Sequence, residues 1–278
     1  MGHVIRLINA SQFRGIGITG KKNDRNDAEA LATALRLGFI PEVYKKSLYP
    51  RRIKSLLASR EVCVNNRISL TNHTRGILRE YGIVMPVGRE EFWKHVRSRL
   101  EKLDCPMISG ILAKLVDEAK RLEELEKETE QALLSLVKDD KRIEQLQTVP
   151  GVGFLSACVF AATIDDSSRF SDCKKVGAYL GLTPKEKSSG DKKRFGRITK
   201  AGPELCRRYF IHGARNLLRH NANPKDQIRV WGKKLEERAG SNKAVVALAH
   251  KNARICFAIL RDGTVFGTTK VATQKIAA

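Results

Sequence analysis

A heptad-spaced run of mostly apolar residues between positions 108 and 136 constrains the fold of this 278-residue chain more than any other feature. Its members recur alternately four and three positions apart, the spacing at which one helix packs a continuous seam against another. They are Ile108, Leu112, Leu115, Ala119, Leu122, Glu126, Thr129, Leu133 and Leu136. Glu126 and Thr129 weaken the seam because they are polar. The spacing predicts a coiled coil, either an antiparallel hairpin within the chain or a dimer zipper. A single amphipathic helix packed on its own domain has the same pattern.

The charge of the chain is strongly unbalanced, with 52 lysines and arginines against 30 acidic residues and a formal net charge of +22. Such a surplus opposes compaction but attracts polyanions, which makes a nucleic acid the expected partner. The segment 101–144 is the exception, because it holds twelve acidic and eight basic residues. We therefore expect an acidic spacer between two nucleic-acid-facing parts. A membrane surface is the rival partner, but no helix combines a clean basic face with an aromatic one.

The six cysteines lack the spacing of metal ligands, and the chain is too long and lysine-rich for a disulfide scaffold. We expect reduced thiols, as in a cytosol. The sequence has no signal peptide and no apolar run long enough to span a membrane, so we expect no membrane partner.

Apolar periodicity predicts a mainly helical chain. A first helix begins at Asp24 and stops at Gly38, and a long second helix covers about Pro50–Tyr81. After the heptad seam, helices are predicted at 143–148, 154–164, 174–180, 203–218 and 243–260. A short strand is expected at His3–Ile8, and the tail 267–278 is expected to be disordered.

The turn Pro150–Gly153 joins two predicted helices with the sequence Pro-Gly-Val-Gly, which is typical of a helix-hairpin-helix. Gly151 and Gly153 permit a tight turn, and their backbone N–H groups with the next helix start could hold a DNA phosphate. An ordinary helical hairpin in a protein core uses the same residues. The tetrapeptide favours neither interpretation, and the basic background favours phosphate binding.

The segment Pro184–Gly202 is the most basic loop of the chain, and it places Ser188 and Ser189 before Gly190. Cations around a serine hydroxyl can stabilise an alkoxide and a pentacoordinate phosphate, as phosphodiester attack requires. Taken alone, the composition favours the simpler interpretation, a flexible loop that grips a nucleic-acid backbone. The bases are Lys185, Lys187, Lys192, Lys193, Arg194, Arg197 and Lys200.

Asp24 and Asp27 are three positions apart at the start of the first helix, so they share a face. Two carboxylates in this geometry can help to hold Mg²⁺. Capping of the helix N-terminus and attraction to its dipole explain the same residues and are favoured without further information.

These motifs occur in an order that resembles one family. Lys-Asn-Asp-x-x-Asp-Ala at 22–28, the heptad seam, Pro-Gly-Val-Gly, and Ser-Ser-Gly followed by Gly-Arg-Ile-Thr-Lys-x-Gly and an arginine are similar to the insertion-sequence transposases with a DEDD motif. These are bacterial and archaeal recombinases guided by a bridge RNA. The segments 209–218 and 242–260 resemble the C-terminal domain of the same family.

The resemblance implies a mainly α fold with four parts. Residues 1–90 would be the remnant of a RuvC-like (RNase H-like) α/β domain, 91–142 a coiled-coil linker, 143–266 a helical transposase domain with a helix-hairpin-helix and a serine loop, and 267–278 a tail. The first Asp and the Glu of the DEDD set have no match. We therefore expect a truncated chain that lacks about sixty residues of an ordinary domain of this kind. The apolar face of the Asp24 helix would then be unusually exposed.

The same resemblance implies the roles of individual residues. Asp24 and Asp27 match two Mg²⁺ ligands of the family, and Ser189, or with less support Ser188, matches the serine that attacks DNA. The expected function is a DNA transposase that cleaves and rejoins strands through a serine-phosphate link. DNA, a guide RNA and further copies joined through the coiled coil are the expected partners. The alternative is a non-catalytic DNA- or RNA-binding remnant. Nucleic acid would contact Gly151, Gly153, Lys192, Lys193, Arg194, Arg197 and Lys200.

Overall fold

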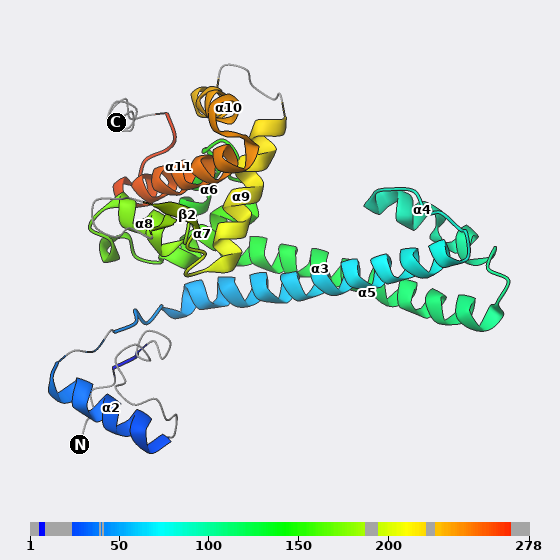
Figure 1. Ribbon diagram of the computed structural model, residues 1–278, viewed down its shortest axis with the longest axis horizontal. Helices are drawn as coiled ribbons and strands as arrows, with labels where there is room; N and C mark the ends of the chain where they lie inside the picture. Colours follow the sequence, from blue (N-terminus) through cyan, green and yellow to red (C-terminus); the bar gives the residue numbers. More distant parts are fainter. Residues whose placement is uncertain are drawn as a thin grey trace. The chain divides into compact units, whose positions relative to one another are not determined.

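The computed structural model describes residues 6–8, 24–38, 40, 42–186, 194–220 and 226–267. These residues are mainly helical, as predicted, and the chain divides into two compact units, Met1–Ser47 and Leu48–Ala278 (Figure 1). The division falls within the range 1–90 that sequence analysis assigns to one domain. The tail expected at 267–278 lies outside the described residues except for Gly267.

The first unit contains helix α2 (Asp24–Arg36) and an isolated antiparallel bridge between Ile8 and Glu42. The predicted strand at His3–Ile8 lies mostly outside the described residues, and only its last residue forms this bridge. Ala34 is the buried residue of α2, whereas Leu31 and Leu35 are exposed. Apolar side chains of this helix are therefore partly exposed, and the truncation from which this exposure was predicted stays a prediction.

The second unit begins with two long helices, α3 (Leu48–Glu80) and α5 (Pro106–Val137), which lie antiparallel along each other (Figure 1). All nine residues of the predicted seam are buried or half-buried. The seam therefore packs against α3 of the same chain. Helix α4 (Arg89–Leu100) packs on both helices through a small core of Leu78, Phe92, Val96, Leu100, Leu112 and Val116.

A buried ion network occupies the polar position of the seam. The Glu126 carboxylate is 5% exposed and accepts hydrogen bonds from Arg60 Nη2 at 2.9 Å and from Arg67 Nε at 3.1 Å. Arg60 also donates to Glu130 at 2.6 Å. A carboxylate that sequence analysis treats as a weak point of the seam is therefore a specific contact between α3 and α5.

The C-terminal part of this unit surrounds helix α7 (Phe154–Ile164), in which every residue from Ser156 to Ile164 is buried. Its neighbours share one core with it that includes Phe160, Leu248 and Phe257. The short strands β1 (Pro184–Glu186) and β2 (Phe195–Ile198) form an antiparallel β-hairpin. The other elements are α6 (Lys141–Gln147), the 3-10 helix η1 (Ser167–Arg169), α8 (Cys173–Tyr179), α9 (Glu204–Arg219), α10 (Gln227–Ala239) and α11 (Ser241–Asp262).

Replacement of Glu126 by alanine should destabilise the chain by about 3–5 kcal/mol, because the buried Arg67 guanidinium would lose its carboxylate and Arg60 would lose one of its two. Urea unfolding measures this difference. Glu128→Ala is the matched control, since Glu128 is exposed on the same helix and its loss should change stability by no more than about 0.5 kcal/mol. Equal stabilities of the two variants would contradict a role for the buried network.

Candidate nucleic-acid interface

The glycine turn, Pro150–Gly153, connects α6 to α7 and has two different sides. Gly151 has a φ of +81°, and Gly153 is the N-cap residue of α7 with no side-chain cap. The Asn252 side chain donates from Nδ2 to the Pro150 carbonyl oxygen at 2.9 Å. The turn is therefore held in place from α11 by a residue that is 1% exposed.

Gly151 faces α9 at very close range. A Cβ on Gly151 would lie 3.0 Å from the Gly213 carbonyl oxygen, and a Cβ on Gly213 would overlap the Gly151 carbonyl oxygen. Gly153 is exposed, and a Cβ there would meet nothing within 4 Å. Gly151 packs against α9, as in a core hairpin. Gly153 is exposed at the N-cap of α7, and its contact with a phosphate stays a prediction.

Gly213→Ala should destabilise the chain by about 1–3 kcal/mol, because the added Cβ forces the turn away from α9. Gly110→Ala is the matched control, since Gly110 is also helical and has open space around its Cα. That substitution should stabilise by about 0.5–1 kcal/mol through helix propensity. Thermal unfolding followed by circular dichroism measures both, and a shift of the same sign would contradict the close packing of the turn.

The β-hairpin places the expected serine segment between two described strands. Ser188 and Ser189, with Lys187, Lys192 and Lys193, lie outside the described residues. In the two strands that border this segment, Pro184 pairs with Ile198 and Glu186 pairs with Phe195. The bases that follow the serine segment are exposed, namely Arg194, Arg197 and Lys200. Phe195 stands among them with 63% of its surface exposed, which provides a stacking surface beside the cations.

Asp24 and Asp27 lie in the first turn of α2, and both are exposed. Their position suits the helix dipole, and it also leaves both carboxylates accessible to a cation. Among the residues that the structure describes, no group of three His, Cys, Asp or Glu side chains could hold a metal ion. The role of Asp24 and Asp27 as metal ligands stays a prediction. They belong to the first unit, whereas the turn and the β-hairpin belong to the second.

The acidic middle of the sequence pairs with arginines of the same unit. Arg60 and Arg67 of α3 and Arg89 and Arg97 of α4 form ion pairs with carboxylates of α5. The expected acidic spacer is thus a partner for basic side chains of α3 and α4.

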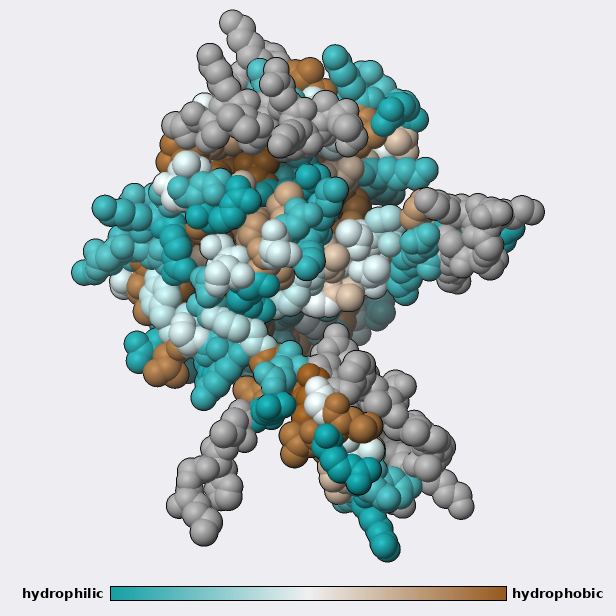
Figure 2. Space-filling model, turned by 90° about the vertical axis from the view of Figure 1, so that its left-hand side faces the viewer, coloured by the Kyte–Doolittle hydropathy of each residue, from teal (hydrophilic) through white to brown (hydrophobic). Residues whose placement is uncertain are grey.

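Hydrophilic side chains cover much of the face shown in Figure 2, with apolar residues in scattered patches.

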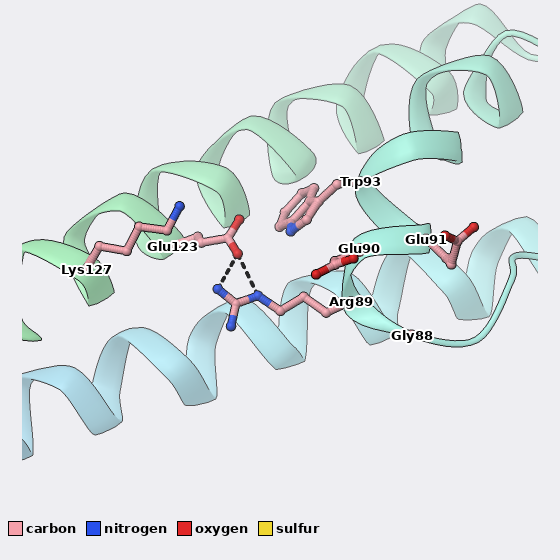
Figure 3. A pocket seen from close by; sticks show the side chains of 7 residues that line it. All are labelled: Gly88, Arg89, Glu90, Glu91, Trp93, Glu123 and Lys127. Atoms are coloured by element: carbon pink, nitrogen blue, oxygen red, sulfur yellow. Dashed lines mark hydrogen bonds and ion pairs between the residues drawn. The ribbon is translucent and has the colours of Figure 1, made fainter. Parts of the chain in front are cut away.

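A cavity of about 750 Å³ lies where α4 begins, beside α5 (Figure 3). Arg89 Nε donates to Glu123 at 2.6 Å across it, and the Trp93 ring lies beside this pair. None of the residues expected to bind nucleic acid or metal lines this cavity. It adds nothing to the candidate interface.

Two buried polar residues of the interface, Arg207 and Asn252, were missed by sequence analysis. Both occupy positions on helix faces that otherwise face the core, Arg207 beside Phe210 and Ala214 and Asn252 beside Leu248 and Cys256. A polar residue inside an apolar stripe of a helix was the available signal.

Within the described part of the chain, no helix is both long and apolar enough to cross a membrane.

A basic hairpin, an open helix N-terminus and a large positive charge are together the features of a protein that binds nucleic acid. Comparison with known families agrees. The profile described as the transposase IS116/IS110/IS902 family matches residues 143–229, and the DEDD transposase profile of IS110 matches residues 2–83.

Similar proteins extend this match over most of the chain. The chain is 36% identical to the transposase for insertion sequence element IS1111A of Coxiella burnetii, over 94% of this chain and 72% of that protein. It is 34% identical to a probable family 20 transposase of Pseudomonas aeruginosa, over 96% of this chain and 80% of that protein. The chain therefore belongs to the insertion-sequence transposases of the IS110/IS116/IS902 family.

Proposed function

We propose that this transposase cleaves and rejoins DNA through the hydroxyl of Ser189. The oxygen attacks a backbone phosphorus and forms a serine–phosphate ester while the bond to one deoxyribose oxygen breaks. The serine proton leaves to solvent, and the released deoxyribose oxygen takes up a proton. Attack by the hydroxyl of another strand end reverses these changes and rejoins the DNA. The observation that carries the proposal is the family match over 143–229, which contains Ser188-Ser189-Gly190 within the basic β-hairpin.

The cations of the β-hairpin provide the electrostatics of this step. Arg194, Arg197 and Lys200 follow the serine segment in the sequence and are exposed, and Lys192 and Lys193 lie closer to it in the sequence. Positive charge aimed at a pentacoordinate phosphate lowers the barrier more than it stabilises the ground state. Exposed Phe195 offers its ring to a base.

The glycine turn would provide a second, sequence-independent DNA contact. Exposed Gly153 and the first N–H groups of α7 would bind a phosphate oxygen, whereas Gly151 serves mainly to bring the turn against α9. Phosphate contacts fix the position of a duplex and read no bases. A guide RNA would then supply the choice of target, as the resemblance implies. The arrangement of several copies on DNA would use surfaces other than the seam that α3 covers.

Asp24 and Asp27 would contribute two oxygen ligands to Mg²⁺ in a RuvC-like domain, which is consistent with the DEDD profile over residues 2–83. The ion supplies positive charge for a phosphate oxygen when it is bound. The contribution of this chain is to present two exposed carboxylates on one helical turn. Further ligands would come from outside the described residues or from DNA.

Ser189→Ala should abolish the covalent protein–DNA adduct that the native chain forms with DNA carrying the ends of its insertion sequence. Denaturing gel electrophoresis after quenching measures the adduct. DNA affinity should stay within about two-fold, because the phosphate contacts come from cations and backbone N–H groups. Ser188→Ala is the matched control and should retain the adduct.

Persistence of the adduct in Ser189→Ala would show that the nucleophile is another residue, and its loss in Ser188→Ala alone would assign that serine instead. If the native chain binds DNA with a steep salt dependence but forms no adduct, the chain is a binding protein without catalysis.

The double variant Asp24→Asn and Asp27→Asn should raise the Mg²⁺ concentration needed for half-maximal adduct formation at least ten-fold, because two anionic ligands become neutral. Its DNA affinity in EDTA should match that of the native chain. Glu29→Gln is the control, since Glu29 is an exposed acid on the same helix. An unchanged Mg²⁺ requirement in the double variant would assign both aspartates to the helix dipole alone.

A further inference from the structure

The β-hairpin leaves the domain through a narrow neck, which consists of residues 179–183 before β1 and residues 199–202 after β2. Gly181 and Gly202 both have positive φ angles, +67° and +74°. A Cβ on Gly181 would overlap the backbone of Ala201, and one on Gly202 would overlap the Tyr179 carbonyl oxygen. The two chain segments therefore cross in direct backbone contact.

Hydrogen bonds join the two segments at this crossing. The Lys200 N–H donates to the Gly181 carbonyl at 3.2 Å, and the Thr199 N–H donates to the Thr183 carbonyl at 2.8 Å. Lys200 has a φ of +55°, which is unusual for a residue with a side chain. The neck thus holds a strained backbone that its surroundings must stabilise.

The Arg207 guanidinium stabilises this crossing from α9. Its side chain is largely buried, and Nη1 donates both to the Leu180 carbonyl at 3.1 Å and to the Ala201 carbonyl at 2.9 Å. One carbonyl belongs to each segment of the neck. No carboxylate of the described residues forms an ion pair with Arg207, so backbone dipoles of the neck provide its hydrogen-bond acceptors.

Helix α9 is itself held by α3 at the helical turn that contains Arg207. The Tyr209 hydroxyl donates to Glu61 of α3 at 3.1 Å, and Arg208 forms an ion pair with the same carboxylate. Burial raises the pKa of Tyr209 to about 12, so its hydroxyl remains a donor at neutral pH. The residue that holds the neck therefore stands on a helix whose own position is set by α3.

We propose that Arg207 is a positioning residue for strand cleavage, which fixes where the β-hairpin stands by tying both segments of its neck to α9. This inference rests on the proposed function of the hairpin. The strands themselves cannot fix it by burial, since six of their seven residues are exposed. The domain core lies around α7, α9 and α11 and does not include the hairpin strands. Loss of Arg207 should therefore disturb the position of the β-hairpin more than the folding of the domain. A displacement of reacting groups by about 1 Å can slow a reaction about 100-fold.

The test compares Arg207→Ala and Arg207→Lys with Arg219→Ala, an exposed charge-loss control on the same helix. In Arg207→Ala, we expect the single-turnover rate of adduct formation at saturating DNA to fall at least 20-fold. DNA affinity should stay within two-fold, and Arg207→Lys should recover part of the rate, because an ammonium group can still donate to a neck carbonyl. Arg219→Ala should keep the native rate.

Hydrogen exchange, read by NMR without DNA, is the second measurement. The amides of Thr199 and Lys200 should exchange at least ten-fold faster in both Arg207 variants, while amides of α7 and α11 keep their protection. Arg207→Lys carries the test if Arg207→Ala fails to fold. Exchange of the Thr199 and Lys200 amides at the native rate in the Arg207 variants would overturn the proposal. An adduct rate in Arg207→Ala within two-fold of the native rate would overturn it as well. Because exchange requires no catalysis, a failure of Ser189 as nucleophile would leave this result standing.

Discussion

The carboxylate of Glu126 is the contact on which the arrangement of the second unit depends. Apolar seams tolerate sliding of one helix along another, since one leucine replaces the next at similar cost. A buried carboxylate between Arg60 and Arg67 opposes such sliding, because a shift of one turn, about 5.4 Å, would take Glu126 away from the buried guanidinium of Arg67. The ion network therefore selects one axial register of α3 on α5.

That register has consequences beyond the two helices. Arg60 also reaches Tyr209 of α9, with Nη1 at 3.4 Å from the hydroxyl, and the next residue of α3, Glu61, binds Tyr209 and Arg208. Arg60 and Glu61, neighbouring residues of α3, thus connect the packing of α3 on α5 to the position of α9.

Most helices could be predicted closely from the sequence, because their apolar periodicity is strong. The helix at 154–164 agrees at both ends, and the helices near 203–218 and 243–260 agree within about two residues. Helices α4 and α10 were missed, since charged residues dominate both and few apolar positions reveal the period. The contact of Gly151 with Gly213 was beyond prediction, because it joins backbone atoms far apart in the chain and leaves no side-chain signal.

Helix α9 emerges as the common support of the candidate interface. Within two turns, Arg207 holds the neck of the β-hairpin, Tyr209 meets α3, and Gly213 receives the glycine turn. The three contacts differ in kind. The Arg207 guanidinium donates to backbone carbonyls, the Tyr209 hydroxyl donates to a carboxylate, and Gly213 allows close packing because it has no side chain. A rigid helix keeps such groups at constant separation, 1.5 Å along the axis per residue. The two features that could hold DNA phosphates are thereby anchored to the same helix, and a strand held at one has a defined relation to the other.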